Sequence, residues 1–275
     1  MYDIIEMSSP NYRVRGCAEP MSIVIHSIGY TLRESISTLT GSESGVSAHY
    51  FIPSITGLEL KELCPDIFND FKLKYPEKVP VISMIPERLS AFHAGVSSWK
   101  NWNKINGCGT SLNDCSIGIE FHSEGYAKGD GSDLFFFTGY TDAQIETGAA
   151  LIQDILNRWD IESSNVLAHS DIAFTRPSGE YKTDPGPLFP WGELHRKYKI
   201  GLYPNKKIGN VCDNDVKSVQ QRLSALGYSC SQSGYMDVST SRCINAYRMH
   251  FMHEKWTQFN GGIDQDLLYS LSCHD

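Results

Sequence analysis

Five side chains, far apart along the chain, have the types needed for metal-assisted hydrolysis. A zinc hydrolase holds its metal through three protein ligands and leaves a fourth position open. It also needs a carboxylate base and a cation or donor for the developing oxyanion. His26, His169 and Asp184 are candidate ligands, Glu120 is a candidate base and Lys182 a candidate cation. These residue types predict hydrolysis at a zinc centre.

Spacing alone does not establish such a site. His26 and His169 are 143 positions apart and form no local motif. A single histidine in an apolar strand is more often a hydrogen-bonded structural residue than a ligand. Glu120 taken alone fits a solvent-facing acid, and Lys182 with Asp184 fits a surface charge pair. Each residue therefore has a structural as well as a functional interpretation.

The stretch YKTDPGP at 181–187 predicts a rigid turn. Pro185 and Pro187 have no amide hydrogen, and Gly186 between them tolerates unusual dihedral angles. Such a turn can hold Asp184 and Lys182 in fixed positions. An exposed, solvated loop is the alternative interpretation.

Strands and helices alternate over the first 199 residues. Apolar runs and alternation predict three strands that carry polar residues, at 22–28, 47–53 and 116–122. A fourth, NVLAHSD at 165–171, has His169 at its end. Helical spacing predicts helices at 32–41 and, with Thr141 as N-cap, from 141 to 159. This pattern predicts an α/β domain, which we place at 1–199.

A second, smaller domain is predicted at the C-terminal end. Residues 200–212 lose periodicity and are interpreted as a linker. Amphipathic spacing then predicts two helices within 215–228 and 239–251, and a third at 264–272. We therefore expect an all-α domain at 213–275.

The composition is that of a globular protein without a general basic surface. The 275 residues carry a formal net charge of −8, with 41% hydrophobic and 20% charged residues. This balance argues against nucleic acid or anionic lipid as a general partner. No run approaches the ~20 apolar residues of a membrane span, and residues 1–22 contain no apolar block of a signal peptide. We expect a monomer without a membrane span.

The sequence is compatible with two cellular compartments for the protein. The absent signal segment favours the cytoplasm, with the eight cysteines as thiols. The even cysteine count, with four cysteines after residue 211, is also compatible with disulfides and the periplasm or cell envelope.

Several runs occur in one order and together resemble a known family. They are IVIH at 23–26, VSAHYFIP at 46–53, FHAGVSSW at 92–99, LNDCSIGIE at 112–120, AHSDIA at 168–173 and KTDPGPLFPW at 182–191. Over about residues 20–196 the chain resembles the zinc-dependent N-acetylmuramoyl-L-alanine amidases of the AmpD/AmiD type, distant relatives of animal peptidoglycan recognition proteins. Residues 213–255 more weakly resemble a three-helix peptidoglycan-binding domain, through VKSVQQRLSALGY and Gly234, Asp237 and Thr240.

The resemblance implies a mixed central sheet flanked by helices and a role for each candidate. His26, His169 and Asp184 would bind Zn²⁺. Glu120 would be the general base and Lys182 the cation beside the metal. The expected reaction is attack of water on the lactyl carbonyl that joins N-acetylmuramic or anhydro-muramic acid to L-alanine, in peptidoglycan or muropeptides.

The same resemblance implies neighbouring roles that are less closely tied to the metal. His49 would lie beside the site without binding metal, and His49 and His122 are the alternatives if the ligand set is wrong. The expected substrate-binding residues are His93, Asn113, Arg176 and Tyr50.

Three stretches depart from the family pattern. An insertion at 177–181 separates Arg176 from Lys182, and extensions lie at 58–79 and 127–139. They fit a groove wall or lid, or surface loops without a function in catalysis.

Two other functions compete with the amidase. A peptidoglycan-binding protein of the same fold would not cleave, but it would not need Glu120, Lys182 and an open metal site. A related zinc hydrolase would cut a different amide within the stem peptide. The masses of the products would separate these functions.

Overall fold

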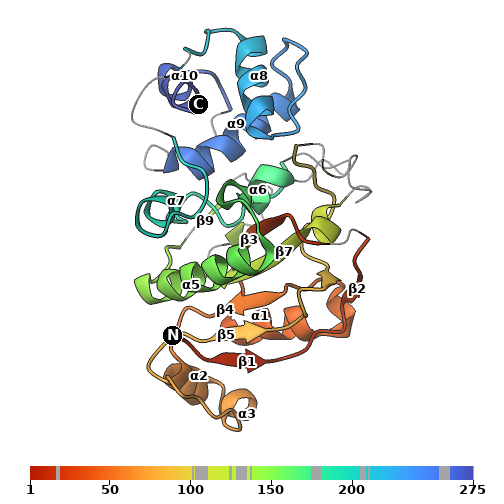
Figure 1. Ribbon diagram of the computed structural model, residues 1–275, viewed down its shortest axis with the longest axis vertical. Helices are drawn as coiled ribbons and strands as arrows, with labels where there is room; N and C mark the ends of the chain where they lie inside the picture. The colour runs from red at the N-terminus through yellow and green to blue at the C-terminus, as the bar shows by residue number, and fades with distance from the viewer. Residues whose placement is uncertain are drawn as a thin grey trace.

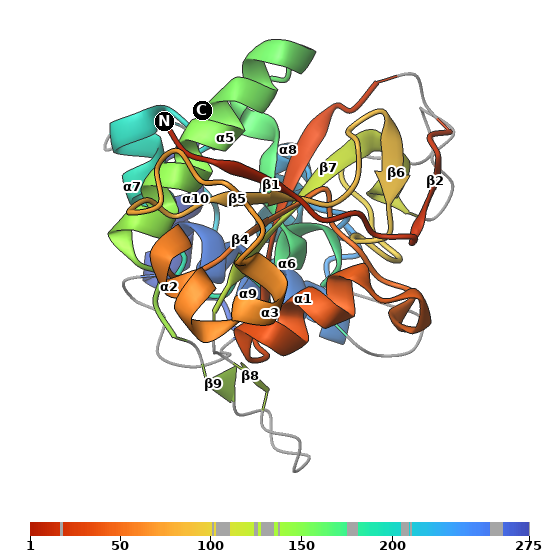
Figure 2. The same ribbon diagram turned by 90° about the horizontal axis from the view of Figure 1, so that it is seen from below.

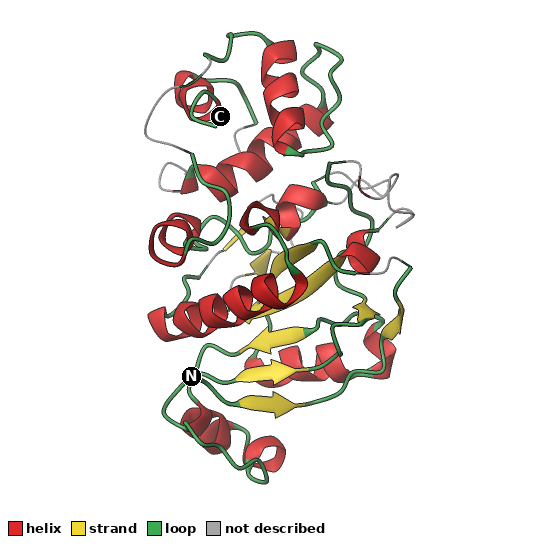
Figure 3. Ribbon diagram, in the orientation of Figure 1, coloured by secondary structure: helices red, strands yellow, loops and turns green. Residues whose placement is uncertain are grey.

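The computed structural model describes most of the chain. The described residues are 1–16, 19–100, 102, 111–123, 126–127, 135–136, 138–174, 181–204, 209, 211–253 and 261–274. Arg176, residues 177–180 of the insertion, and residues 128–134 and 137 of the 127–139 extension lie outside them. A central sheet, helices on both of its faces and a group of C-terminal helices make up the fold (Figures 1 and 3).

Within the described residues, six strands form the central sheet in the order β1-β5-β4-β7-β3-β10. Their bounds are β1 Ile4–Glu6, β5 Val81–Ser83, β4 Tyr50–Ile52, β7 Ser116–His122, β3 Ser22–Ile28 and β10 Val166–Ala168. Strands β4, β7, β3 and β10 are parallel, whereas β5 is antiparallel to β4 and parallel to β1. The sheet is mixed, as predicted.

Strand register brings the predicted site residues to one edge of the sheet. His26 on β3 pairs with Glu120 on β7, so the two side chains share a face. Ala168, the last residue of β10, pairs with Ile25. The next residue, His169, is the first residue of helix α6 (His169–Ile172), not the end of the strand.

Helices cover both faces of the sheet (Figure 2). α5 (Asp142–Trp159) begins at Thr141, which accepts a hydrogen bond from the Gln144 amide, and packs on β3 and β7. Gly148 allows this approach, because a Cβ there would lie 2.4 Å from Phe121 Cζ. The opposite face at the β1 end is covered by α1 Leu32–Thr40, α2 Gly57–Leu63 and α3 Pro65–Phe68.

The 58–79 extension therefore forms α2, α3 and their connections rather than a wall beside Glu120. Leu60 and Phe68 pack with Ile5 and Ile82 in the apolar cluster over β1 and β5. Figure 1 shows α2 and α3 at the end of the molecule remote from α6.

Short elements complete the part before residue 204. Two antiparallel pairs lie outside the central sheet, β2 with β6 and β8 with β9. The remaining bounds are β2 Tyr12–Val14, β6 Leu89–Ala91, β8 Tyr126–Ala127, β9 Phe135–Phe136, η1 Ser42–Ser44, η2 Leu112–Cys115, η3 Ser163–Asn165, α7 Trp191–Glu193 and the π-helical turn η4 Leu194–Tyr198.

Three C-terminal helices occur where the spacing predicts them: α8 Val216–Leu226, α9 Val238–Phe251 and α10 Gln265–Leu271. Each begins at an aspartate whose side chain accepts a backbone hydrogen bond: Asp215, Asp237 and Asp264. The Gly234, Asp237 and Thr240 pattern joins α8 to α9, since Gln220 bonds both the Gly234 amide and Thr240 Oγ1. We call residues 213–274 the C-terminal helical unit.

One hydrophobic cluster crosses from the sheet into the C-terminal helical unit. Val24 and Leu167, on the sheet face opposite α5, and Phe174, after α6, belong to the same buried cluster as residues of α8, α9 and α10. The helices therefore share a core with the strands that carry the predicted ligands.

Six of the eight cysteines lie within the described residues, and they divide into two groups. Five are free and buried: Cys64, Cys212, Cys230, Cys243 and Cys273. Cys115 is disulfide-bonded, so the prediction of eight thiols is wrong at this position. Among the described residues, none of the helices has the length and apolar character needed to cross a bilayer.

Candidate metal centre and active site

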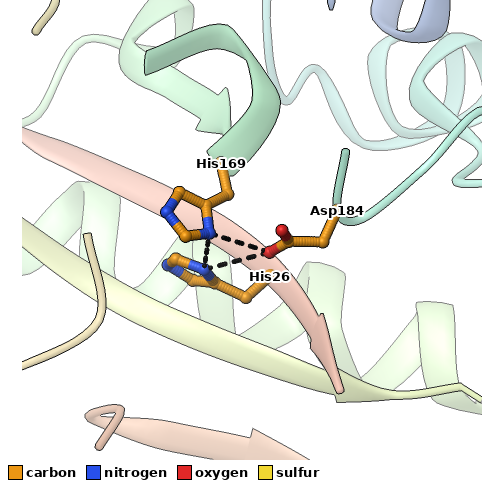
Figure 4. Close-up of side chains that lie close together, drawn as sticks. All are labelled: His26, His169 and Asp184. Carbon is orange, nitrogen blue, oxygen red and sulfur yellow. Dashed lines mark hydrogen bonds and ion pairs between the residues drawn. The ribbon is translucent and has the colours of Figure 1, made fainter. Parts of the chain in front are cut away.

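His26, His169 and Asp184 converge, with one nitrogen or oxygen of each facing the other two (Figure 4). The Nδ1 atoms of His26 and His169 are 2.9 Å apart. Asp184 Oδ2 lies 2.9 Å from His169 Nδ1 and 3.3 Å from His26 Nδ1. Residues from β3, α6 and the 181–187 turn thus form one triangle.

The triangle fits a small tetrahedral cation. Ligand bonds of about 2.0–2.1 Å put neighbouring ligand atoms roughly 3.3 Å apart in a tetrahedral site, so a small expansion accommodates Zn²⁺. The His26 and His169 side chains are 2% and 4% exposed, whereas Asp184 is 20% exposed. Solvent therefore reaches the triangle from the Asp184 side, where a fourth ligand position would be open.

Helix α6 and the 181–187 turn are tied together by backbone hydrogen bonds. The Ser170 amide donates to Asp184 O at 3.0 Å, and the Lys182 amide donates to Ala173 O at 3.0 Å. Gly186 has φ +85°, and the Asp184–Pro185 peptide is cis. These bonds place Asp184 against the first turn of the helix that begins with His169.

A hydrogen-bond chain sets the orientation of His26. Its Nε2 lies 2.9 Å from His93 Nδ1, and His93 Nε2 lies 3.2 Å from Ser116 Oγ. Because Ser116 donates its hydroxyl proton to Leu112 O at 2.7 Å, it accepts from His93, and His93 in turn accepts from His26. This order leaves the His26 Nδ1 lone pair facing the triangle.

His169 has an equivalent partner. Its Nε2 donates to Ala94 O at 3.3 Å, which leaves Nδ1 as the acceptor atom. Asn113 Oδ1 accepts from the His93 and Ala94 amides at 3.1 and 2.6 Å and so holds the loop that contacts both ligands. His93 and Asn113, predicted to line the substrate groove, lie behind the ligands and orient them.

Charges in the triangle suit cation binding. Burial, together with the neighbouring His169, lowers the pKa of His26 to about 4, so its imidazole is neutral near pH 7. Burial raises the pKa of Asp184, but His169 and His26 oppose this more strongly and hold that pKa well below its usual value. The cluster therefore presents a neutral ligand and an anionic one.

Glu120 lies on the same sheet face as His26, and its Oε2 is buried without a hydrogen-bond partner among the described residues. Burial, and next the charge of Asp184, raise the pKa of Glu120 well above its usual value, while Lys182 opposes this. Lys182 also lowers the pKa of His26. The Lys182 charge therefore acts on both the candidate base and one candidate ligand.

Tyr50 does not reach this site. It pairs with Ile119, so it projects from the sheet face opposite Glu120. Its hydroxyl donates to Glu87 Oε1 at 2.8 Å. We therefore leave Tyr50 out of the proposed site.

The two alternative histidines are occupied elsewhere. His49 Nδ1 accepts from the Gly118 amide, and its Nε2 faces Leu89 O. His122 lies between Ser54 Oγ and Tyr30 O. Neither belongs to the triangle.

Comparison with known proteins identifies the family. A family profile described as N-acetylmuramoyl-L-alanine amidase matches residues 17–187. AmiD of Escherichia coli K12 is 32% identical over 252 residues, which are 89% of this chain and 78% of that protein. The chain belongs to this amidase family. The sequence prediction of an AmpD/AmiD-like amidase is confirmed.

Further relatives agree with the amidase assignment. AmpD of Enterobacter cloacae, a 1,6-anhydro-N-acetylmuramyl-L-alanine amidase, is 32% identical over 71% of this chain and 90% of that protein. The E. coli AmiD complex with anhydro-N-acetylmuramic acid-L-Ala-D-γ-Glu-L-Lys superposes with a TM-score of 0.68 at 28% identity, over 97% of this chain and 89% of that one. AmpDh3 from Pseudomonas aeruginosa gives a TM-score of 0.70 at 27% identity, over 92% and 90%.

Two residues that support the site of this amidase escaped sequence reasoning. Ser116 ends the chain that orients His26. Buried Arg15 donates to the carbonyls of Asn113 and Ser116, at 3.2 and 2.9 Å. An isolated arginine or serine carries no local motif, so the sequence offered no signal for either.

Proposed function

We propose that this amidase hydrolyses the amide between N-acetylmuramic or anhydro-muramic acid and L-alanine, with Zn²⁺ held by His26, His169 and Asp184. The convergence of their three ligand atoms carries the proposal. Solved relatives hold an anhydro-muramic peptide, which supports this substrate class.

Glu120 is the proton carrier in the proposed reaction. A zinc ion held by the triangle would lower the pKa of a water molecule and polarise the scissile carbonyl. Glu120 takes the proton of the attacking water and returns it to the departing L-alanine amine. Its unpartnered Oε2 and raised pKa suit a group that must both accept and donate a proton.

Lys182 stabilises the negative charge that develops on the carbonyl oxygen. The Lys182 amide donates to Ala173 O, which fixes the Lys182 backbone next to α6. The Lys182 charge acts on both Glu120 and His26, and so it can balance negative charge that develops between them.

Metal analysis combined with product masses tests the function. Purified protein should contain about one zinc per chain and release an intact peptide that begins at L-alanine from soluble anhydro-muropeptides or sacculi. A shortened peptide would indicate cleavage of another amide. Unchanged fragments would indicate a binding protein.

Glu120→Gln and Lys182→Met should retain zinc but lose activity. Each change removes one stabilising group, and we expect kcat to fall by about a hundredfold or more. Glu43→Gln and Lys197→Met, both at exposed positions outside the proposed site, are the matched controls. Wild-type turnover in either site variant would remove the role assigned to that residue.

We further propose that residues 1–199 form the catalytic domain, 200–212 a linker and 213–275 a helical domain. We also propose that the protein acts as a monomer on peptidoglycan or its fragments. The three capped helices support the last boundary. Light scattering of the full chain measures the oligomeric state, and a dimer would contradict the monomer.

A further inference from the structure

Asp171 is a fully buried carboxylate two residues after the ligand His169, and the mechanism does not use it. Its Oδ2 accepts from the Ala168 amide at 2.8 Å and from His250 Nδ1 at 2.6 Å. Its Oδ1 accepts from the Tyr228 hydroxyl at 2.6 Å. Both side-chain donors belong to the C-terminal helical unit, far from Asp171 in sequence.

Aromatic packing holds both donors in place. The His250 ring stacks on Trp191 with centroids 3.9 Å apart. The Tyr228 ring meets Trp99 edge-on at 4.9 Å. Tyr228 also lies in the cluster shared by the sheet and the C-terminal helices, so little water is available to replace a lost donor. An unpaired carboxylate in such a place is strongly unfavourable.

Helix α6 depends on outside contacts because it has only four residues, His169–Ile172. A helix of one turn is not stable alone, and most of its order comes from tertiary packing. α6 supplies His169, its Ser170 amide donates to Asp184 O, and Ala173, directly after the helix, accepts from the Lys182 amide. The hydrogen bonds to Asp171 therefore hold in place the helix that carries His169 and contacts the backbone of Asp184.

We propose that Tyr228 and His250 are positioning residues for the metal site, and that they act through Asp171 and α6. The C-terminal helical unit then completes the site, whether or not it also binds peptidoglycan. The effect on zinc rests on the proposed function. The effect on α6 does not.

Zinc affinity of the full chain tests the first part. Tyr228→Phe and His250→Phe each remove one donor and keep an aromatic ring. Both should weaken zinc binding about tenfold or more in competition with a chelator, as for other groups that orient metal ligands. His250→Asn, whose amide can replace the Nδ1 donor, should recover part of the affinity.

Tyr247→Phe is the matched control. It removes a buried hydroxyl that contacts Ser270 Oγ at 2.7 Å inside the C-terminal helical unit and does not reach Asp171. Its zinc affinity should equal that of the wild type. Equal loss in Tyr247→Phe and Tyr228→Phe would assign the effect to general destabilisation and overturn the proposal.

Hydrogen exchange of the metal-free protein tests the second part. The Ser170, Ala173 and Lys182 amides should exchange faster in Tyr228→Phe than in the wild type, while β3 amides stay unchanged. Wild-type exchange and zinc affinity in Tyr228→Phe would overturn the proposal even if His250→Phe does not fold. If the wild type does not bind zinc, the proposed function is contradicted. The hydrogen-exchange result would still show whether Tyr228 holds α6 in place.

Discussion

His26 is suited to be a metal ligand because its surroundings keep it neutral and point one nitrogen at Asp184. His49 and His93, buried beside it, are affected in the same way. Burial, and next the Arg15 charge, lower the pKa of His49 to about 3, and burial holds that of His93 well below its usual value. The floor of the site is thus a group of imidazoles that stay uncharged at neutral pH.

Acid should destabilise the metal-free protein well above the range where carboxylates titrate. The folded-state pKa values of His26 and His49 are below the unfolded value near 6.5, so the unfolded chain binds more protons between about pH 6.5 and 4. The stability is complete above 6.5 and is lost as pH falls. We expect a loss on the order of 1–2 kcal/mol per histidine by pH 5.

Urea unfolding of chelator-treated protein at several pH values measures this loss. His49→Asn, which keeps an acceptor for the Gly118 amide, should show a shallower dependence on pH. The same slope in this variant and the wild type would show that His49 does not contribute.

Residue type and order were enough to name His26, His169 and Asp184, which the structure brings together, because these residues stand in runs that resemble a family. The roles of Glu120 and Lys182 stay predictions. The roles of His93 and Asn113 could not be predicted in that way. They depend on which nitrogen faces which partner, and a hydrogen-bond direction such as His26 to His93 to Ser116 exists only in three dimensions.

Strand direction decides which side chains of β4 can act. Successive residues point to opposite faces, so Phe51 shares a face with Glu120 and Tyr50 does not. On its own face Tyr50 joins Arg158 and Trp159, from the end of α5, in hydrogen bonds to Glu87. These contacts join β4 to α5 on the sheet face opposite Glu120.

Tyr50→Phe should therefore leave activity unchanged and lower stability. Loss of the bond to Glu87 should cost about 1 kcal/mol in the free energy of unfolding, measured by urea denaturation. The kcat/KM for an anhydro-muropeptide should match the wild type. A large fall in kcat/KM without a fall in stability would return Tyr50 to the substrate site.

Long elements were predicted closely, whereas several short ones were not predicted. The apolar run 22–28 and the helical spacing of 142–159 contain enough residues to show a period. Strands β1 and β5 have three residues each, and α6 has four, so they carry too little pattern. Their order comes from neighbours in the sheet and in the core.

One apolar cluster joins α8–α10 to the sheet, so these two parts of the chain share a core. Val24, Leu167 and Phe174 lie in it with residues of the C-terminal helical unit. The sequence predicted the helices and a linker before them. It could not predict the shared core, because amphipathic spacing shows that a face is apolar but not what covers it.

Deleting residues 205–275 should destabilise the remaining chain rather than only weaken peptidoglycan binding. The deletion uncovers the sheet side of the cluster and leaves Asp171 without its two side-chain donors. We expect a lower thermal midpoint or aggregation, measured by circular dichroism and light scattering. A truncated protein with the wild-type midpoint and zinc affinity would contradict this.

The contact of Asp171 with His250 also affects when the metal site can form during synthesis of the chain. Domains generally fold in the order in which they are synthesised. Here the helix that begins with His169 gains its last donor only after residue 250 has been made, some eighty residues later. A nascent chain that already contains all three ligands should still hold zinc weakly. The amidase should therefore become competent only after residue 250 has been made and helices α8 and α9 have docked.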